Sequence, residues 1–500
     1  MIVELICLSL ILLGGFAFVY TMGIRGVAAI SLGFIMGLAI QVIIGTVLIM
    51  INVPYNAVIT VGLTFLLPFL LLIYTCIKGI TSISFIRLLT YIAVSIAVVT
   101  ITVTLLFNEG FVKWSYDSMR YLLSSQIMYE NRLELLSEDL LTKRMFGVPI
   151  IHSPAQIVGE VYLRAVFPLL GIATFTTLMC FIYQGLKKRV SKKTMWFLVF
   201  AGGLLLLTNN RFVWNSFYIN GHLFCAALAL VISGCAWFMV SDDNKSKKRL
   251  LAIIIVAIPA LVLTRSESIL VAALAVLPIL AAKILSWKYK SAILLSLGVS
   301  AVICHSFILL LLDNGINSLV FSYVLFGILL TFLAILLKFL IKLKVIKFVV
   351  TNIVIISELL LWYTLIILSY QNRYIINTTL ESIYHNIILG DGAWGWSFVI
   401  LICLTISVLL LIKRPKNMAI LRFPVTTFLP FMFILAHLRE SPYRVGFGDS
   451  MNRMLIQIVP LAILFIVMSI GLGDFRFTKE RCVLYIEKIK KIVYNQIDDA

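Results

Sequence analysis

Apolar stretches of about 20 residues recur along the whole chain, and they constrain the fold more than any other feature. Each stretch is long enough to cross a hydrocarbon layer of about 30 Å. Because no water is available there to satisfy the backbone, each crossing segment must form a helix with internal hydrogen bonds. The alternating pattern of an outer-membrane barrel is not seen in the sequence. The sequence therefore predicts an all-α polytopic bundle of about fifteen transmembrane helices.

Composition agrees with this prediction. Of the 500 residues, 62% are hydrophobic and only 13% are charged, whereas a soluble domain carries about 25% charged residues. We place the spans at about 2–22, 27–52, 56–77, 86–107, 163–184, 194–208, 219–240, 249–264, 267–283, 291–311, 318–337, 348–369, 396–412, 421–437 and 454–472. The chain then divides into N-terminal transmembrane helices (1–107), a large exterior loop (108–162), a transmembrane helical core (163–472) and a basic cytoplasmic tail (473–500).

Basic residues are concentrated in alternate loops. One alternating set, with the C-terminal tail, holds about 29 of the Lys and Arg residues, and the other set holds about 12. Because cytoplasmic loops carry the excess of Lys and Arg, we expect the N-terminus outside and the C-terminus inside. This bias accounts for most of the net charge of +19. The sequence shows no basic platform with interleaved aromatic residues, so we expect no nucleic-acid partner.

Sequence motifs that mark several other classes of protein are absent from this chain. The eight cysteines fall in predicted spans or in the tail and form no CxxC pair, so we expect neither a disulfide framework nor a thiolate metal site. The sequence contains no Walker loop, no GxGxxG after a strand and no HExxH. We therefore do not expect an ATP-driven pump or a zinc protease.

The segment 108–162 is the longest predicted loop, with about 55 residues. It is rich in aromatic residues, and its leucines recur at roughly helical spacing. We predict two amphipathic helices at the membrane surface, at about 115–130 and 132–145, with Leu122, Leu133 and Leu136 buried on one stripe. Glycine and prolines then break the helical pattern around His152.

This loop resembles the first exterior loop of the GT-C superfamily of membrane glycosyltransferases. The resemblance is carried by WSYDSMRYLLSSQIMYENRLEL, followed by FGVPIIHSP and the next span. In that family an acidic residue follows a helix that emerges outside, and an amphipathic helix and a Pro-containing stretch come next. Three later segments are similar to family segments in the same order, namely FYINGHLFCAALAL, TRSESILVAALAVLPIL and SMNRMLIQIVPLAIL.

The chain also departs from the family pattern. Three helices come before the helix that leads into the long loop, where many family members have one helix before the loop. Asn220 and His222 stand where the family has an acid, and Ser268 stands where it often has Gly. The resemblance covers about 108–472 and implies transfer of a sugar from a polyprenyl-phosphate donor to a cell-envelope acceptor, as in polysaccharide biosynthesis.

Such a transfer needs a base for the acceptor hydroxyl and cations or a metal for the departing phosphate. Asp117 is the candidate base, because it follows a span and is flanked by aromatic residues that can stack on sugars. The alternative is a surface ion pair between Asp117 and Arg120, three residues apart on one helix. The sequence leaves open whether a divalent metal takes part.

Candidate phosphate ligands lie in two other exterior loops. Arg265 and Glu267 occupy a very short loop, where Glu267 would orient the guanidinium; the alternative is an interfacial pair. Arg444 and Arg453 belong to an arginine cluster before the last span, and Arg453 is expected to point inward. That cluster would otherwise bind anionic lipid headgroups.

Four further residues are expected around the substrate. Glu160 lies one turn before the fifth span, and His152, Asn220 and His222 lie at helix mouths. The two histidines are either hydrogen-bonding site residues or structural residues of the helix ends. The membrane lipid is an expected partner, while the oligomeric state, the sugar and the acceptor are not given by the sequence.

Two other features invite a functional interpretation. Glu358 lies near the middle of a predicted span, where an acid is costly and suggests function, unless it is protonated and bonded to a neighbouring helix. Trp394 and Trp396 are typical of an interfacial aromatic belt, although acceptor binding is an alternative. The segment 209–211 is predicted to turn the chain.

Two rival functions stay open. An O-antigen-type polysaccharide polymerase or ligase also has many spans and exterior arginines, but its largest loop is expected late in the chain. A lipid-linked-saccharide flippase or transporter is expected to show internal repeats and broken helices near the midplane. An exterior cavity under the long loop would favour the enzyme, and a central cavity between symmetric halves would favour transport.

Overall fold

The structure is a computed structural model that describes residues 1–107, 112, 115–241, 247–312, 318–340 and 342–475. Within these residues the regular elements are helices, apart from one pair of two-residue strands. The predicted all-α polytopic bundle is therefore confirmed. The predicted basic tail, 473–500, lies almost entirely outside the described residues.

Ten helices in the described part of the chain are long and apolar enough to cross a membrane. They are α1 (Ile2–Thr21), α2 (Val27–Met50), α3 (Ala57–Ile77), α4 (Phe85–Phe107), α8 (Val166–Leu186), α11 (His222–Ser241), α14 (Trp287–Leu311), α15 (Ser318–Leu340), α17 (Ile353–Gln371) and α20 (Ala419–Leu438). An eleventh segment passes the same test only if its two parts, which are bent by 42°, count as one span; it is made of α21 (Ser450–Met454), η5 (Leu455–Gln457) and α22 (Val459–Leu472).

Four more predicted spans are present as shorter helices. They contain 14 to 16 residues, so each covers about 21–24 Å at 1.5 Å per residue. These helices pack against α8, α11, α20 and α22, which lie beside them in the bundle. The four are α9 (Lys192–Leu207), α12 (Lys247–Val262), α13 (Ser268–Ala281) and α19 (Ser397–Leu411).

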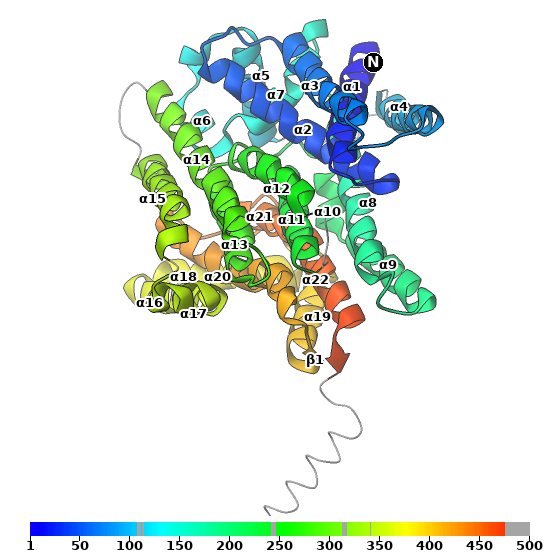
Figure 1. Ribbon diagram of the computed structural model, residues 1–500. Helices are drawn as coiled ribbons and strands as arrows, with labels where there is room; N and C mark the ends of the chain where they lie inside the picture. The colour runs from blue at the N-terminus through cyan, green and yellow to red at the C-terminus, as the bar shows by residue number, and fades with distance from the viewer. Residues whose placement is uncertain (108–111, 113–114, 242–246, 313–317, 341, 476–500) are drawn as a thin grey trace, which may run out of the picture.

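The first two helices pack closely because glycines line their contact. A side chain on Gly15 of α1 would overlap the backbone of Gly33 and Gly37 of α2, and one on Gly37 would overlap Ile11. Small residues let helix backbones approach, which drives helix association where burial from water is not available. Figure 1 shows the N-terminal group α1 to α4 on one side of α11 to α13, with the α16–α18 region on the other side.

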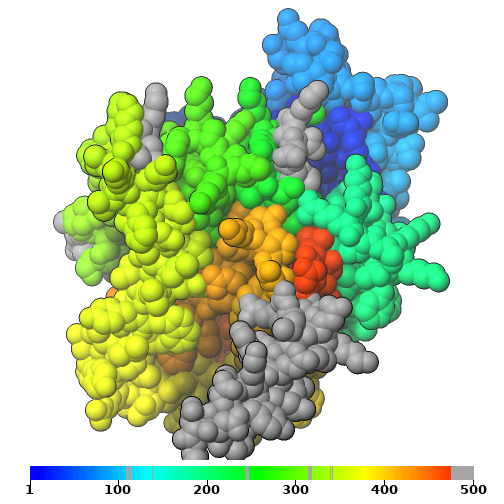
Figure 2. All heavy atoms as spheres, turned by 60° about the horizontal axis from the view of Figure 1, so that its bottom comes forward, coloured from blue at the N-terminus to red at the C-terminus, as the bar shows by residue number. Residues whose placement is uncertain are grey.

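The loops gather on two faces, as the alternating topology predicts. On one face, β1 (Ile412–Lys413) pairs with β2 (Asp474–Phe475), and Asn417 Nδ2 donates a 2.6 Å hydrogen bond to Ser241 Oγ. Figure 2 looks onto the β1 side, where teal, orange and red segments near residues 190, 415 and 470 come forward. We call this the opposite face. The other, the site face, carries the segments 115–165, 209–221, 263–267, 372–396 and 439–449.

The long loop folds into short helices on the site face. These are α5 (Tyr116–Tyr129), η1 (Leu133–Leu135), α6 (Glu138–Arg144), α7 (Gly147–His152) and η2 (Ser153–Val158). The first predicted amphipathic helix is confirmed as α5. The second predicted helix, at 132–145, is wrong in its first half. Asn131 has a positive φ, which stops the chain from continuing as an α-helix after α5, and α6 begins only at Glu138. Leu122 and Leu136 are buried, and Leu133 is partly buried.

The remaining elements connect the spans. On the site face, α10 (Asn210–Asn215) precedes α11, and α18 (Arg373–Ile383) with the π-turn η3 (Tyr384–Leu389) precedes α19. On the opposite face, α16 (Lys344–Thr351) and η4 (Lys416–Met418) precede α17 and α20.

Glu358 does not lie near the middle of a span, as the sequence suggested. The predicted span began at 348, but the helix breaks at Asn352, so Glu358 is in the second turn of α17. Its carboxylate receives hydrogen bonds from Arg422 Nη2 and Thr426 Oγ1, both at 2.8 Å, near the start of α20. Because the pair ties two helix ends together on the opposite face, we interpret it as structural.

Candidate functional site

Asp117 lies in the first turn of α5, which is held against the segment that precedes α11. Ser118 Oγ donates a 3.0 Å hydrogen bond to the carbonyl of Ile219, and Ser115 N donates to Ser118 Oγ at 3.2 Å. The hydroxyls of Ser115 and Tyr218 are also hydrogen-bonded. These hydrogen bonds cap the first turn of α5 and attach it to the segment before α11, which fixes the position of Asp117.

Two arginines from distant parts of the chain bind Asp117. Arg144, at the end of α6, and Arg453, in α21, both form ion pairs with its carboxylate. Burial raises the pKa of Asp117, but the charges and hydrogen bonds of Arg453 and Arg144 outweigh burial and lower the pKa to about 2. The Asp117 carboxylate is therefore ionised at neutral pH.

Arg120 does not pair with Asp117. Its guanidinium forms an ion pair with Asp139 and lies 4.1 Å from the centre of the Tyr116 ring. Arg120 thus connects α5 to α6 through its ion pair with Asp139. The alternative in which Asp117 and Arg120 form a simple surface pair is wrong, because the arginine partners of Asp117 come from other elements.

Arg265 and Glu267 form a second buried group beside the first. Arg265 Nε lies 2.6 Å from Glu267 Oε1, and Arg265 Nη1 donates a 2.6 Å hydrogen bond to the hydroxyl of Tyr121. Tyr121 is one turn after Asp117 on α5, so one face of this helix contacts both groups. Glu267 is only 1% exposed. Burial raises the pKa of its carboxyl group, but the charges of Arg265 and Arg439 lower this pKa by more, so the net shift is downward.

A pocket of about 410 Å³ opens beside these groups on the site face. Its wall includes Arg439, Arg444 and Arg453, with Asp449 among them. Arg439 also lies 3.9 Å from Glu267. Arg453 therefore connects the pocket to the Asp117 group, and Arg439 connects it to the Arg265 group.

Asp449 shapes the pocket wall more than it neutralises the arginines. Its Oδ1 accepts a hydrogen bond from Arg444 N at 2.9 Å, and its Oδ2 accepts one from Met451 N at 2.6 Å at the start of α21. Burial raises the pKa of Asp449 despite these bonds. With one acid and three arginines on its wall, the pocket is suited to an anion.

His222 and Asn220 support the start of α11 behind the pocket. Asn220 Oδ1 accepts a 2.7 Å hydrogen bond from His222 N, and Asn220 Nδ2 donates to Asn215 Oδ1 at 2.9 Å. The His222 ring is 2.9 Å from Gln457 Nε2, four residues after Arg453. Both side chains are buried, so they position α11 and the segment that carries Arg453.

Glu160 and His152 do not join this site. Glu160 is half-exposed and pairs with Arg164 at 3.4 Å. His152 is fully buried; its Nδ1 accepts a 3.2 Å hydrogen bond from Leu163 N, and burial lowers its pKa to about 3. A neutral histidine packed against Phe167 is a structural residue. The convergence expected of Asp117, Arg265, Glu267 and Arg453 is therefore seen without Glu160.

Sequence reasoning missed Arg144 and Tyr121. Arg144 is only 6% exposed although it ends a short surface helix, and it also lies 3.2 Å from Asp139. Tyr121 is fully buried. Neither residue lies in a recognisable motif. The one available signal was that both lie in the two segments predicted to be amphipathic helices, 115–130 and 132–145.

Arg211 was expected only to help turn the chain, yet it is 1% exposed. Its guanidinium donates hydrogen bonds to the carbonyls of Gly392 and Phe447 and lies 4.0 Å from the Phe447 ring centre. The neighbouring Asn209 does turn the chain, since its Oδ1 accepts from Phe212 N at 2.9 Å. Arg211 thus holds the pocket segment 439–453 against the 372–396 segment.

Trp394 and Trp396 behave differently, although both were expected in an aromatic belt. Trp394 is fully buried, and its Nε1 donates a 2.8 Å hydrogen bond to Asn452 Oδ1. Trp396 is 74% exposed, which is compatible with the membrane interface. The expectation is wrong for Trp394, because it anchors the residue next to Arg453.

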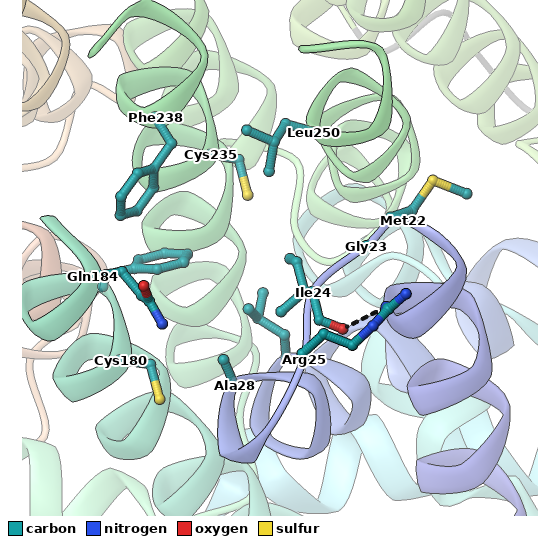
Figure 3. A pocket seen from close by; sticks show the side chains of 12 residues that line it. Met22, Gly23, Ile24, Arg25, Ala28, Cys180, Gln184, Cys235, Phe238 and Leu250 are labelled. Carbon is teal, nitrogen blue, oxygen red and sulfur yellow. Dashed lines mark hydrogen bonds between the residues drawn. The ribbon is translucent and has the colours of Figure 1, made fainter. Parts of the chain in front are cut away.

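Another cavity, of about 350 Å³, opens at the opposite face among the α1–α2 turn, α8, α11 and α12 (Figure 3). Arg25 is the one charged residue on its wall, and its guanidinium is hydrogen-bonded to the carbonyls of Tyr20 and Ile24. The cavity wall carries no acid and no histidine. This cavity therefore offers no carboxylate or imidazole that could accept a proton.

Fold and site together define a polytopic all-α membrane protein with an arginine-lined pocket next to an ionised aspartate. Comparison with family models, with curated protein sequences and with solved structures finds no match to this chain. In the described part of the chain, no group of three His, Cys, Asp or Glu side chains is placed to hold a metal ion.

Proposed function

We propose that this protein is a membrane glycosyltransferase that moves a sugar from a polyprenyl-phosphate donor to a cell-envelope acceptor. The observation that carries the proposal is the ion pair between Asp117 and Arg453 at the wall of the pocket formed with Arg439 and Arg444. An acid and several cations at one pocket are the two requirements of this transfer.

In this proposal the site face is the exterior face. The loops of the opposite face carry most of the Lys and Arg residues, which supports a cytoplasmic position for that face. The N-terminus is then outside and the C-terminus inside. The donor's isoprenoid tail stays in the membrane, and its phosphate reaches the pocket at the ends of the helices.

Arg439, Arg444 and Arg453 hold the phosphate of the donor. During transfer the acceptor hydroxyl attacks the anomeric carbon, the bond from that carbon to the phosphate oxygen breaks, and polyprenyl phosphate leaves. Negative charge grows on the phosphate as the bond breaks, so fixed guanidinium groups bind the transition state more tightly than the donor. Glu267 and Tyr121 keep Arg265 in place behind these groups.

Asp117 accepts the proton of the acceptor hydroxyl. With Arg144 and Arg453 both bound to it, Asp117 has a pKa of about 2 and is a weak base. A bound phosphate competes for Arg453, so donor binding weakens the Arg453–Asp117 pair and raises the pKa of the carboxylate. This coupling makes the base available when the donor is present.

The polymerase or ligase alternative uses the same pocket, since the arginines of 439–453 would then hold a lipid diphosphate. It differs in the product, which is a lengthened or transferred glycan chain. The transport alternative would favour a central cavity between symmetric halves, whereas the pockets described above open at the site face and at the opposite face.

The test is transfer of radiolabelled sugar by the purified full-length protein in liposomes that contain polyprenyl-phosphate sugars and cell-envelope acceptors. The proposal expects product from wild type and loss of product in Asp117→Asn, while Arg132→Gln, an exposed arginine of the same face, keeps activity. Transfer of preformed glycan chains only would favour the polymerase or ligase, and no transfer with any donor would contradict the proposal.

A further inference from the structure

A basic pocket lies at the opposite face, away from the site described above. It has a volume of about 410 Å³ and lies where α13 ends, α14 begins and α16 crosses them. Three of its nine lining residues are lysines, and none is acidic; the lysines are Lys283, Lys290 and Lys347.

Lys290 is the central feature of this pocket. It is only 4% exposed, and its Nζ lies 4.4 Å from the centre of the Trp287 ring. Within the described residues no carboxylate lies within ion-pair distance of Lys283, Lys290 or Lys347. A buried ammonium without a counter-ion is costly, and one aromatic face offsets only part of that cost. The three lysines therefore make the pocket suited to an anion.

The surroundings indicate that this anion belongs to an amphipathic molecule. Leu280, Leu285 and Val350 line the pocket together with the lysines. On α16, Val345 and Phe348 are 73% and 66% exposed on either side of Lys347. A short helix with apolar side chains exposed beside a basic pocket is typical of a segment at the membrane surface.

We propose that Lys283, Lys290 and Lys347 form a binding site for the phosphate of an anionic membrane lipid. Basic pockets between transmembrane helices recognise such headgroups by charge, with the acyl chains along the apolar helix surface. Trp287 restricts the Lys290 ammonium to the pocket, and the two exposed lysines add charge at its mouth. The bound lipid holds α13, α14 and α16 together on this face.

The test is native mass spectrometry of the purified full-length protein with phosphatidylglycerol or with phosphatidylcholine. Wild type is expected to retain phosphatidylglycerol, and Lys283→Gln/Lys347→Gln to bind it roughly thirtyfold more weakly, since each lysine near a lipid surface contributes about 1 kcal/mol. Lys290→Gln is expected to reduce retention as well, while Lys290→Arg keeps it. Lys78→Gln, an exposed lysine that ends α3 on the same face, is the matched control.

The two exposed lysines can be changed without disturbing the core, so their double variant remains informative if Lys290→Gln fails to fold. Inorganic phosphate that binds wild type and displaces the lipid completely would assign the pocket to a soluble phosphate compound instead. Equal retention of both lipids by wild type, the double variant and Lys78→Gln would overturn the site.

Discussion

Asp117 and Arg453 are separated by 336 positions in the sequence and form an ion pair at the wall of the arginine-lined pocket. Asp117 begins a short surface helix, whereas Arg453 belongs to the bent segment that opens the last span. The pair is therefore where the long early loop and the C-terminal helices meet, and it couples the candidate base to the candidate phosphate ligand.

A comparison of variants at this pair separates a chemical role from a binding role. Asp117→Asn keeps the shape but cannot accept a proton, so we expect turnover to fall by about 10² to 10⁴ without weaker donor binding. Arg453→Ala removes a charge-assisted contact worth about 1.5–3 kcal/mol, so donor binding weakens by roughly ten- to a hundredfold. Steady-state kinetics and donor titration measure both, with Arg132→Gln as control. Full turnover in Asp117→Asn would refute the base assignment and make Glu267 the next residue to test.

The low pKa of Asp117 predicts an acid-sensitive contribution to stability. Because its folded pKa of about 2 is below the ordinary value of 3.8, ionised Asp117 stabilises the fold above pH 4. This contribution is lost as the pH falls from about 4 to 2. Melting temperatures of wild type and Asp117→Asn should therefore differ by a constant amount from pH 8 to 5 and converge in acid. A gap that narrows already near pH 6 would show that another group is responsible.

Arg211 should be needed for the shape of the pocket, although it does not line it. Arg211→Met removes its hydrogen bonds to the carbonyls of Gly392 and Phe447, each worth about 1.5–3 kcal/mol. We expect a lower melting temperature and weaker donor binding, because the 439–453 segment loses its attachment. Arg132→Met, at an exposed position, should change neither. Unchanged melting and binding in Arg211→Met would rule out this positioning role.

Glycine at the α1–α2 contact should be required for assembly. Gly15→Ala places a methyl group against the backbone of Gly33 and Gly37, and overpacking of this kind costs about 1–3 kcal/mol or more. Gly62→Ala in α3 meets no atom within 4 Å and should be tolerated. The yield of folded protein on size-exclusion chromatography and its melting temperature compare the two. Equal behaviour would mean that α1 and α2 do not pack as described.

The orientation is tested by cysteine labelling in a cysteine-free background. Ser137, before α6, and Ser286, before α14, are exposed on the site face and the opposite face. We expect Ser137→Cys in intact cells to react with a membrane-impermeant maleimide and Ser286→Cys to react only after permeabilisation. The reverse result would invert the topology and move the arginine-lined pocket to the cytoplasm.

Several site residues were predictable because local chemistry places them at helix ends. Asp117, Arg265, Glu267 and Arg453 each lie just outside an apolar stretch, so their presence on one face follows from hydropathy alone. Hydropathy did not predict which residues form ion pairs with them. The sequence offered Arg120 for Asp117, because only pairs three or four residues apart on one helix can be read as contacts without knowledge of the fold.

The sequence by itself determined the all-α bundle, the order of its helices and the alternation of its loops, because continuous apolar segments without strand-type alternation satisfy their backbone in a membrane as helices. Only the tertiary structure decided that Arg144 and Arg453 hold Asp117, that Glu160 and His152 stay outside the site, and that Trp394 is buried. The reason is physical: hydropathy fixes how deep a residue lies along its own helix, whereas its neighbours are set by the packing of helices hundreds of residues apart.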